Sequence, residues 1–180
     1  SSSLVGSEMC IRDSLCLFNH EEVGSTSAAG AAGNLLPLLI QRIFKGIDQS
    51  EALAKSTLVS ADGAHATHPN YLEKHDLDHE IRMNAGIAIK RNSNERYATS
   101  AIGQATAQNI CEGNNIPYQL FSNRSDLACG STIGPISSAN LGINTIDLGV
   151  PQLSMHSTRE LCGESDVLAL ENFLFNFFES

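Results

Sequence analysis

The chain has 180 residues, of which 42% are apolar and 17% charged, and it contains no tryptophan. This composition is typical of one folded domain and excludes disordered and collagen-like chains. The net charge of −9 argues against nucleic acid as a partner, because binding to phosphates relies on lysine and arginine. No apolar run approaches the ~20 residues of a membrane-spanning helix, so no membrane contact is expected.

The cysteines and the amino terminus indicate the compartment and the domain boundary. The five cysteines are odd in number and lack CxxC spacing, which favours reduced thiols in a cytoplasmic protein. Residues 1–14 have no basic region followed by a long apolar stretch, so they do not form a signal peptide. We interpret residues 1–14 as a foreign or adapter-derived segment and expect residues 15–180 to form the domain.

Apolar patterns of strand and helix type alternate along the chain. Residues 15–18 are short and apolar, which predicts a buried strand, and residues 26–47 predict a helix in which Pro37 introduces a break. Further strands are predicted at 57–62, 86–92, 118–121 and 143–149, and further helices at 95–113, 132–141 and 164–179. This alternation predicts an α/β fold, a three-layer sandwich with a largely parallel mixed sheet.

Several polar residues follow the ends of the predicted strands, where sites of parallel sheets gather. Glu21 and Glu22 follow the first strand, Asp62 ends the second, Asp147 closes a later one, and His156 lies in the loop beyond it. Carboxylates and imidazole suit zinc and related divalent ions, whose charge offsets the repulsion between adjacent glutamates. The alternative is a solvated glutamate pair beside ordinary turn residues. Asp147 is expected to be a structural cap.

Four segments carry a more specific pattern: 20-HEEVGS-25, 60-SADGAHATHPNY-71, 124-RSDLACGSTIGP-135 and 147-DLGVPQLSMHSTRE-160. Together they resemble the aspartyl aminopeptidases of peptidase family M18, over almost all of residues 15–180. The resemblance implies the incomplete C-terminal part of a metallo-aminopeptidase catalytic domain. The family's upstream histidine and bridging aspartate ligands would lie outside this fragment, so the resemblance also implies little activity for the chain alone.

The resemblance assigns a metal centre and its base. Glu21 matches the general base of the family, which takes a proton from the attacking water. Glu22 and His156 match the ligands of one metal, and Asp62 matches a ligand of the other. Two divalent metal ions are therefore expected, with zinc as the first choice and manganese or cobalt as alternatives.

The resemblance also assigns substrate contacts to Glu21, His65, Lys90 and Tyr97. Lys90 would pair with the side-chain carboxylate of an N-terminal aspartate or glutamate, which is costly to bury without a partner. Without the resemblance, the sequence predicts that Lys90 is a solvated lysine at the end of a strand. Three further histidines are expected to lie mostly at the surface, without a metal: His68, His75 and His79.

The expected function is therefore the removal of N-terminal aspartate or glutamate from peptides, by a full-length protein that forms a homo-oligomer. Two alternatives stay open. One is an aminopeptidase of a neighbouring two-metal family with a different specificity, in which Lys90 would not select acidic substrates. The other is a non-catalytic subunit or cargo scaffold of the same fold, although the intact set of Glu21, Glu22, Asp62 and His156 argues against decay.

Overall fold

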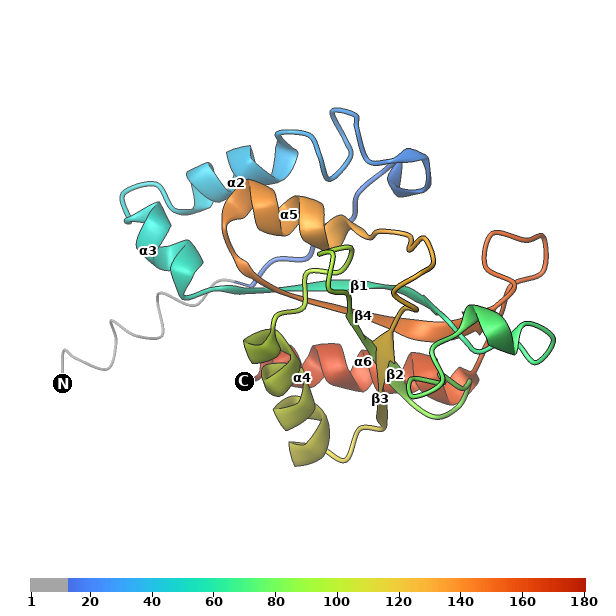
Figure 1. The fold of residues 1–180 in the computed structure, drawn as a ribbon. Coiled ribbons are helices and arrows are strands. Elements are labelled where there is room, and N and C mark those ends of the chain that lie inside the picture. The colour runs from blue at the N-terminus through green and yellow to red at the C-terminus, as the bar shows by residue number, and fades with distance from the viewer. Residues whose placement is uncertain (1–12) are drawn as a thin grey trace.

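A computed structural model describes residues 13–180, so most of the expected foreign segment 1–14 lies outside the described residues. A central sheet has helices on both faces, which gives three layers (Figure 1). One face carries α2 (Leu35–Ile43), α3 (Gln49–Ala54) and α5 (Ile133–Leu141), and the other carries α4 (Ala101–Gly113) and α6 (Glu164–Phe178). None of the helices within residues 13–180 has the length and apolar character to cross a membrane.

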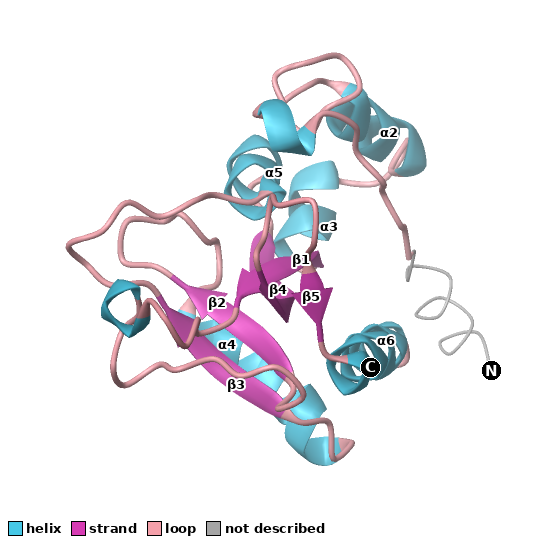
Figure 2. Ribbon diagram, turned by 90° about the vertical axis from the view of Figure 1, so that its right-hand side faces the viewer, coloured by secondary structure: helices cyan, strands magenta, loops and turns pink. Residues whose placement is uncertain are grey.

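The sheet is mixed, as the sequence predicts. Its strands are β1 (Thr57–His65), β2 (Ile87–Arg91), β3 (Tyr118–Ser122), β4 (Asn144–Leu153) and β5 (Leu161–Cys162). They follow the order β1-β4-β2-β3, and β5 pairs with the end of β4 (Figure 2). The pairs β1–β4 and β2–β3 are parallel, whereas β2 and β5 both run antiparallel to β4.

Side-chain alternation divides β2 between two clusters of buried residues. Ile87 and Ile89 pack into the core under α4 and α6, which also contains Phe173. Ala88 belongs to the opposite cluster, with Tyr97 and Phe121. Lys90 follows the same alternation as Ala88, so the strand directs this ammonium group away from the larger apolar core.

The same alternation in β4 places a charged residue on the face that α5 covers. Ile146 and Leu148 pack into the α4–α6 core, so Asp147 between them points to the other side. The register pairs Ser60 of β1 with Asp147, and Asp62 with Gly149. Asp62 and Asp147 therefore share one face of the sheet, which is also the face toward which Lys90 alternates.

Two predicted elements near the start of the domain are wrong. The expected strand at residues 15–18 is a loop in which Leu15 and Leu17 are 79% and 86% exposed. A strand needs a neighbour to accept and donate its backbone hydrogen bonds, and an apolar run does not supply one. The expected helix at 26–47 is shorter, because turns occupy residues up to 34 and α2 begins at Leu35. Pro37 lies in its first turn, where proline is tolerated.

Candidate active site

The adjacent glutamates open a short 3-10 helix, η1 (Glu21–Val23), on the side of the sheet that α5 covers. Glu22 reaches the loop that follows β4, where its Oε2 lies 2.7 Å from Nε2 of His156. Both side chains are well exposed. The structure therefore brings a carboxylate and an imidazole from distant parts of the sequence into direct contact.

Backbone strain marks both ends of this contact. His20 and Ser25, which flank η1, have φ values of 63° and 60°. Ser154 and His156 in the facing loop have φ values of 58° and 64°. Non-glycine residues rarely occupy this left-handed region, and those that do gather at functional sites. Four of the seven non-glycine residues with positive φ in the described part of the chain thus flank or include Glu21, Glu22 and His156; the others are Asn84, Glu95 and Asn115.

Lys90 forms the second charged contact. Its side chain is 1% exposed, and its Nζ lies 3.5 Å from Oδ2 of Asp62 and 2.9 Å from the Gly63 carbonyl oxygen. The interpretation of Lys90 as a solvated lysine is therefore wrong, because β2 turns its side chain inward. Asp62 keeps 43% of its side chain exposed, so the pair joins a buried cation to the surface of the site.

An aromatic wall completes the surroundings of Lys90. The Tyr97 ring centroid lies 5.0 Å from Nζ, within range of a cation–π interaction. Phe121 packs against the same ring, with centroids 5.9 Å apart. Burial raises the pKa of the Tyr97 phenol, and its hydrogen bond with Cys129 acts in the same direction. Tyr97 is therefore a neutral, fixed side chain beside the ammonium group.

Glu21 connects the two charged pairs electrostatically. Its pKa is raised, first by burial and then by the negative charges of Asp62 and Glu22. The positive charges of His156 and Lys90 act in the opposite direction. All four neighbours are therefore close enough to act on its carboxyl group, which suits a residue that exchanges protons.

The donor types at this site fit a divalent metal ion, although they do not form a complete cage. Carboxylate and imidazole are the ligands that zinc takes in proteins, and Glu22 and His156 already lie together. Asp62 is turned toward Lys90 instead. Within residues 13–180, no group of three or more histidine, cysteine, aspartate or glutamate side chains is arranged to hold a metal. The described residues thus bring a carboxylate and an imidazole together without completing a set of metal ligands.

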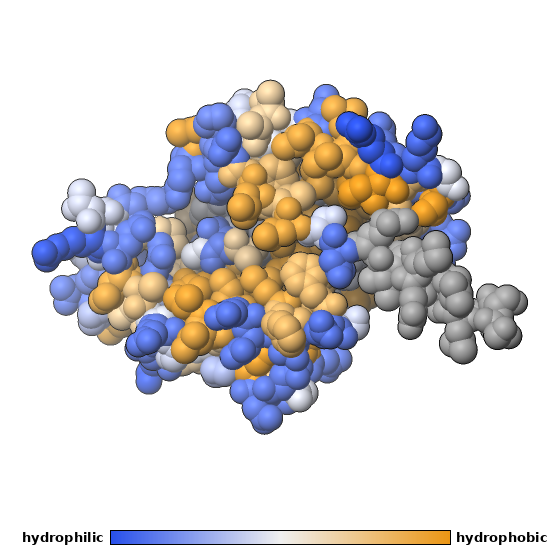
Figure 3. All heavy atoms as spheres, turned by 180° about the vertical axis from the view of Figure 1, so that it is seen from behind, coloured by the Kyte–Doolittle hydropathy of each residue, from blue (hydrophilic) through white to orange (hydrophobic). Residues whose placement is uncertain are grey.

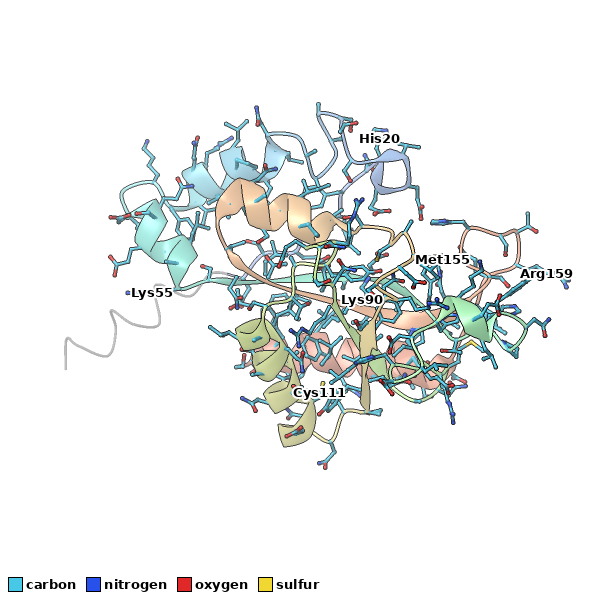
Figure 4. All side chains as sticks on the ribbon, viewed as in Figure 1. His20, Lys55, Lys90, Cys111, Met155 and Arg159 are labelled. Atoms are coloured by element: carbon cyan, nitrogen blue, oxygen red, sulfur yellow. The ribbon has the colours of Figure 1, made fainter. Side chains whose placement is uncertain are left out.

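A cavity of about 500 Å³ opens beside these groups, between the loop after β1 and the ends of β3 and β4. His65 and Met155 lie in its wall. Figure 4 labels Met155 and His20, which both lie in the right half of that view. His65 keeps part of its ring exposed, and burial of the remainder lowers its pKa.

The three other loop histidines, expected mostly at the surface, are half-buried in the wall of the same cavity: His68, His75 and His79. Their hydrogen bonds are local. His75 Nε2 accepts the His68 backbone N–H at 3.2 Å, and His79 Nδ1 lies 2.8 Å from Asp76 Oδ1. These contacts give His75 and His79 hydrogen-bond partners within the loop itself.

The position of Asp147 in the structure differs most from the position that the sequence predicted. Asp147 does not close a strand, because β4 continues to Leu153. It is fully buried in the middle of β4 and accepts hydrogen bonds from the Ala98 backbone N–H and the Thr132 hydroxyl. A charged residue between the two apolar residues Ile146 and Leu148 of a predicted strand is the sequence signal that could have indicated this role.

The sequence of the chain matches a known protein family. The model of the family described as aminopeptidase I zinc metalloprotease (M18) matches residues 5–178. The chain belongs to the M18 peptidase family.

Sequence relatives within the M18 family extend well beyond this chain. A probable M18 family aminopeptidase 2 from Pseudomonas fluorescens (strain Pf0-1) is 47% identical over 174 residues, which are 96% of this chain and 40% of that protein. Its counterpart from Pseudomonas savastanoi pv. phaseolicola is 46% identical over 179 residues, 99% of this chain and 42% of that protein. The chain thus spans about 40% of the length of these relatives.

Solved structures agree with the M18 assignment. The cryo-EM structure of the Ape4 and Nbr1 complex contains a chain that is 43% identical, with a TM-score of 0.87 over 90% of this chain and 32% of that one. The S. cerevisiae mApe1 dodecamer is 34% identical, with a TM-score of 0.81 over 91% of this chain and 37% of that one. The three-layer M18 fold is therefore present here, and one of these neighbours is a dodecamer.

Proposed function

We propose that the protein to which this segment belongs removes N-terminal aspartate or glutamate from peptides. Family membership supports peptide hydrolysis by a metallopeptidase. The single observation that carries the acidic specificity is the buried ammonium group of Lys90, which pairs with the partly exposed Asp62 and is faced by Tyr97. A substrate carboxylate loses its hydration when it is buried. A buried cation beside an aromatic ring compensates for that loss by pairing with the carboxylate.

The residues would divide the chemistry among them. Glu22 and His156 would hold one divalent ion and Asp62 the other, with zinc the expected metal and manganese or cobalt the alternatives. Bound divalent ions lower the pKa of water toward neutrality and so supply a nucleophile. Glu21 would accept the proton of that water and return it to the departing amine, as its position among the four charged neighbours suggests.

The substrate would be held by its charged amino-terminal residue. Lys90 would pair with the side-chain carboxylate, Tyr97 would close over that pair, and His65 would contact the substrate at the edge of the neighbouring cavity. Glu21 would also lie against the substrate, beside the bond that is broken. Peptides with N-terminal aspartate or glutamate are thus the proposed partners.

The cellular setting is part of the same proposal. Four cysteines within residues 13–180 have free thiols, which is consistent with a cytoplasmic protein. A relative solved as a dodecamer supports a homo-oligomer for the full-length protein.

A chimera tests the proposal. We would replace the matched segment of the P. fluorescens enzyme with this chain and measure kcat/KM, with added zinc or manganese, on dipeptides that begin with aspartate or leucine. The chimera should favour the acidic peptide, and Lys90→Met should reduce its hydrolysis on the order of 100-fold, the effect of losing a buried charge pair. Lys45→Met, which removes an exposed lysine, is the control.

Each alternative predicts a different result. Equal losses on acidic and neutral peptides in Lys90→Met would indicate an aminopeptidase of another specificity. A folded chimera that binds zinc and hydrolyses neither peptide would indicate a non-catalytic subunit. The isolated chain should release little aspartate, because its described residues do not complete a set of metal ligands.

A further inference from the structure

A buried carboxylate joins the two chain segments that enclose Lys90. Asp147 is fully buried, and its Oδ2 accepts the backbone N–H of Ala98 at 2.5 Å. The next residue, Thr99, bonds to the same strand twice. Its hydroxyl accepts the Asp147 backbone N–H at 2.8 Å and donates to the Asp147 carbonyl oxygen at 3.2 Å. The segment that carries Tyr97 is therefore fastened to β4 at this point.

The second carboxylate oxygen holds the start of α5. The buried Thr132 hydroxyl donates to Asp147 Oδ1 at 2.7 Å and also accepts the Gly134 backbone N–H at 3.3 Å as the helix cap. Gly134 rests directly on the carboxylate, because a Cβ added there would overlap it. The loop that ends at Thr132 is thus fixed to the same side chain as the Tyr97 segment.

Both segments border Lys90. Tyr97 precedes Ala98 in the chain and places its ring 5.0 Å from Nζ. Cys129, in the loop before Thr132, packs against the cluster that contains Tyr97 and Phe121. Asp147 forms no hydrogen bond or ion pair with Lys90 among the described residues, although its charge acts on the ammonium group from a distance. Its effect on the shape of the pocket passes through these two walls.

We propose that Asp147 is a positioning residue that keeps the Tyr97 segment and the loop of Cys129 closed around Lys90. The inference rests on the proposed function of Lys90 in binding an acidic side chain. Without the carboxylate, the Ala98 N–H and the Thr132 hydroxyl would lose their acceptor, and a buried unpaired donor destabilises the closed arrangement. The pocket would then open more often while the α4–α6 core stays folded.

Alkylation of Cys129 tests this step on the chain itself, without any activity. In Asp147→Asn, iodoacetamide should modify Cys129 on the order of tenfold faster, as expected when local opening becomes easier by one hydrogen bond to a charged group. Cys111, fully buried in the α4–α6 core, should stay protected and so report that the domain is folded. Peptide mass spectrometry separates the two thiols.

Asp166→Asn is the matched control. Asp166 is also fully buried and accepts two backbone N–H groups, from Asn84 at 2.6 Å and Gly86 at 2.7 Å, but it lies on α6 at the other face of the sheet. It should lower the stability of the domain and leave Cys129 alkylation unchanged. At the loop itself, Thr132→Val should accelerate the alkylation of Cys129. Thr132→Ser, which keeps the hydroxyl, should leave the alkylation of Cys129 as slow as in the parent chain.

The same substitutions in the chimera connect the pocket to specificity. Asp147→Asn should raise KM for the acidic dipeptide on the order of tenfold and leave the neutral dipeptide largely unaffected, whereas Asp166→Asn should not change their ratio. Unchanged Cys129 alkylation, or an unchanged ratio, would overturn the positioning role. If the unaltered chimera cleaves no peptide, the proposed function fails, and the alkylation rates still decide what Asp147 does.

Discussion

The ammonium group of Lys90 lies inside the protein, 3.5 Å from the Asp62 carboxylate. Burial lowers its pKa, and the charges of Asp62 and Asp147 oppose that shift. A buried charge without such partners would cost several kcal/mol, so the two aspartates are what allow the cation to remain there. The site thereby contains a positive charge in an acidic protein of net charge −9. Without that positive charge, the negative charge of the protein would repel a carboxylate substrate.

His75 should make the loop between β1 and β2 sensitive to pH. Its pKa is lowered, first by burial and then by His68, against the opposing charges of Glu73 and Glu80. Because the folded pKa lies below the unfolded value of ~6.5, its contribution to stability is present above that value and is lost as the pH falls through the folded pKa. The His68 amide, which donates to His75 Nε2, should be less protected at low pH.

Hydrogen exchange measured as protection factors at acidic and neutral pH checks this expectation for His75. His75→Gln, whose side chain offers an acceptor that does not titrate, should remove the pH dependence. Equal protection of the His68 amide in the parent chain at both pH values would show that His75 does not titrate in the predicted way.

At the scale of elements, capping side chains decide where the helices begin. The helix predicted from residue 95 starts at Ala101, because the Ser100 hydroxyl accepts the Gly103 N–H at 3.0 Å and Glu95 has a φ of 54°. Thr132 caps α5 in the same way, at the residue where the sequence predicted that helix to begin. Hydroxyl caps of this kind are worth about 1 kcal/mol each, enough to move a helix start by several residues.

Gly86, the residue just before β2, should be indispensable for that strand. Its φ of 104° disfavours any side chain, and an added Cβ would overlap the backbone of Pro117, the residue just before the neighbouring strand β3. Gly86→Ala should lower the free energy of unfolding by about 3 kcal/mol. Gly46→Ala is the matched control, since Gly46 has a φ of 86° but open space around it, and should cost about 1 kcal/mol. Urea denaturation measures both, and equal losses would exclude the steric contribution.

The molecule as a whole leaves much apolar surface in contact with water. Figure 3 shows apolar side chains gathered across its rear face. On α2 the exposed residues include Leu38 and Leu39, and on α6 they include Leu168 and Phe175. β1 is an edge strand of the sheet. Surfaces of this kind associate with other protein surfaces, because burial of apolar area is favourable.

The isolated chain should therefore self-associate. Its weight-average sedimentation coefficient should rise with protein concentration in the micromolar range, and the double variant Leu38→Lys, Phe175→Lys should reduce that rise. Leu77→Lys, which changes an exposed leucine outside both helices, serves as the control. A coefficient that stays at the monomer value over the whole range would contradict the expectation.

By itself, the sequence determined the features that depend on local pattern and on motif spacing. Apolar periodicity gave the alternation of strands and helices from residue 57 onward, because side-chain direction follows a fixed repeat within each element. The motifs identified the M18 family and singled out Glu21, Glu22, Asp62 and His156. The roles assigned to these residues, and to His65, Lys90 and Tyr97, stay predictions.

Only the tertiary structure decided which residues are buried and which strands are neighbours. Lys90 is inside because β2 lies between β4 and β3, and the antiparallel contact of β2 with β4 follows from the path of the chain. Residues 15–18 fail as a strand because no neighbour pairs with them. Asp147 joins three segments that are distant in sequence. Burial and pairing depend on contacts between remote segments, and a local pattern contains no information about which segments will meet.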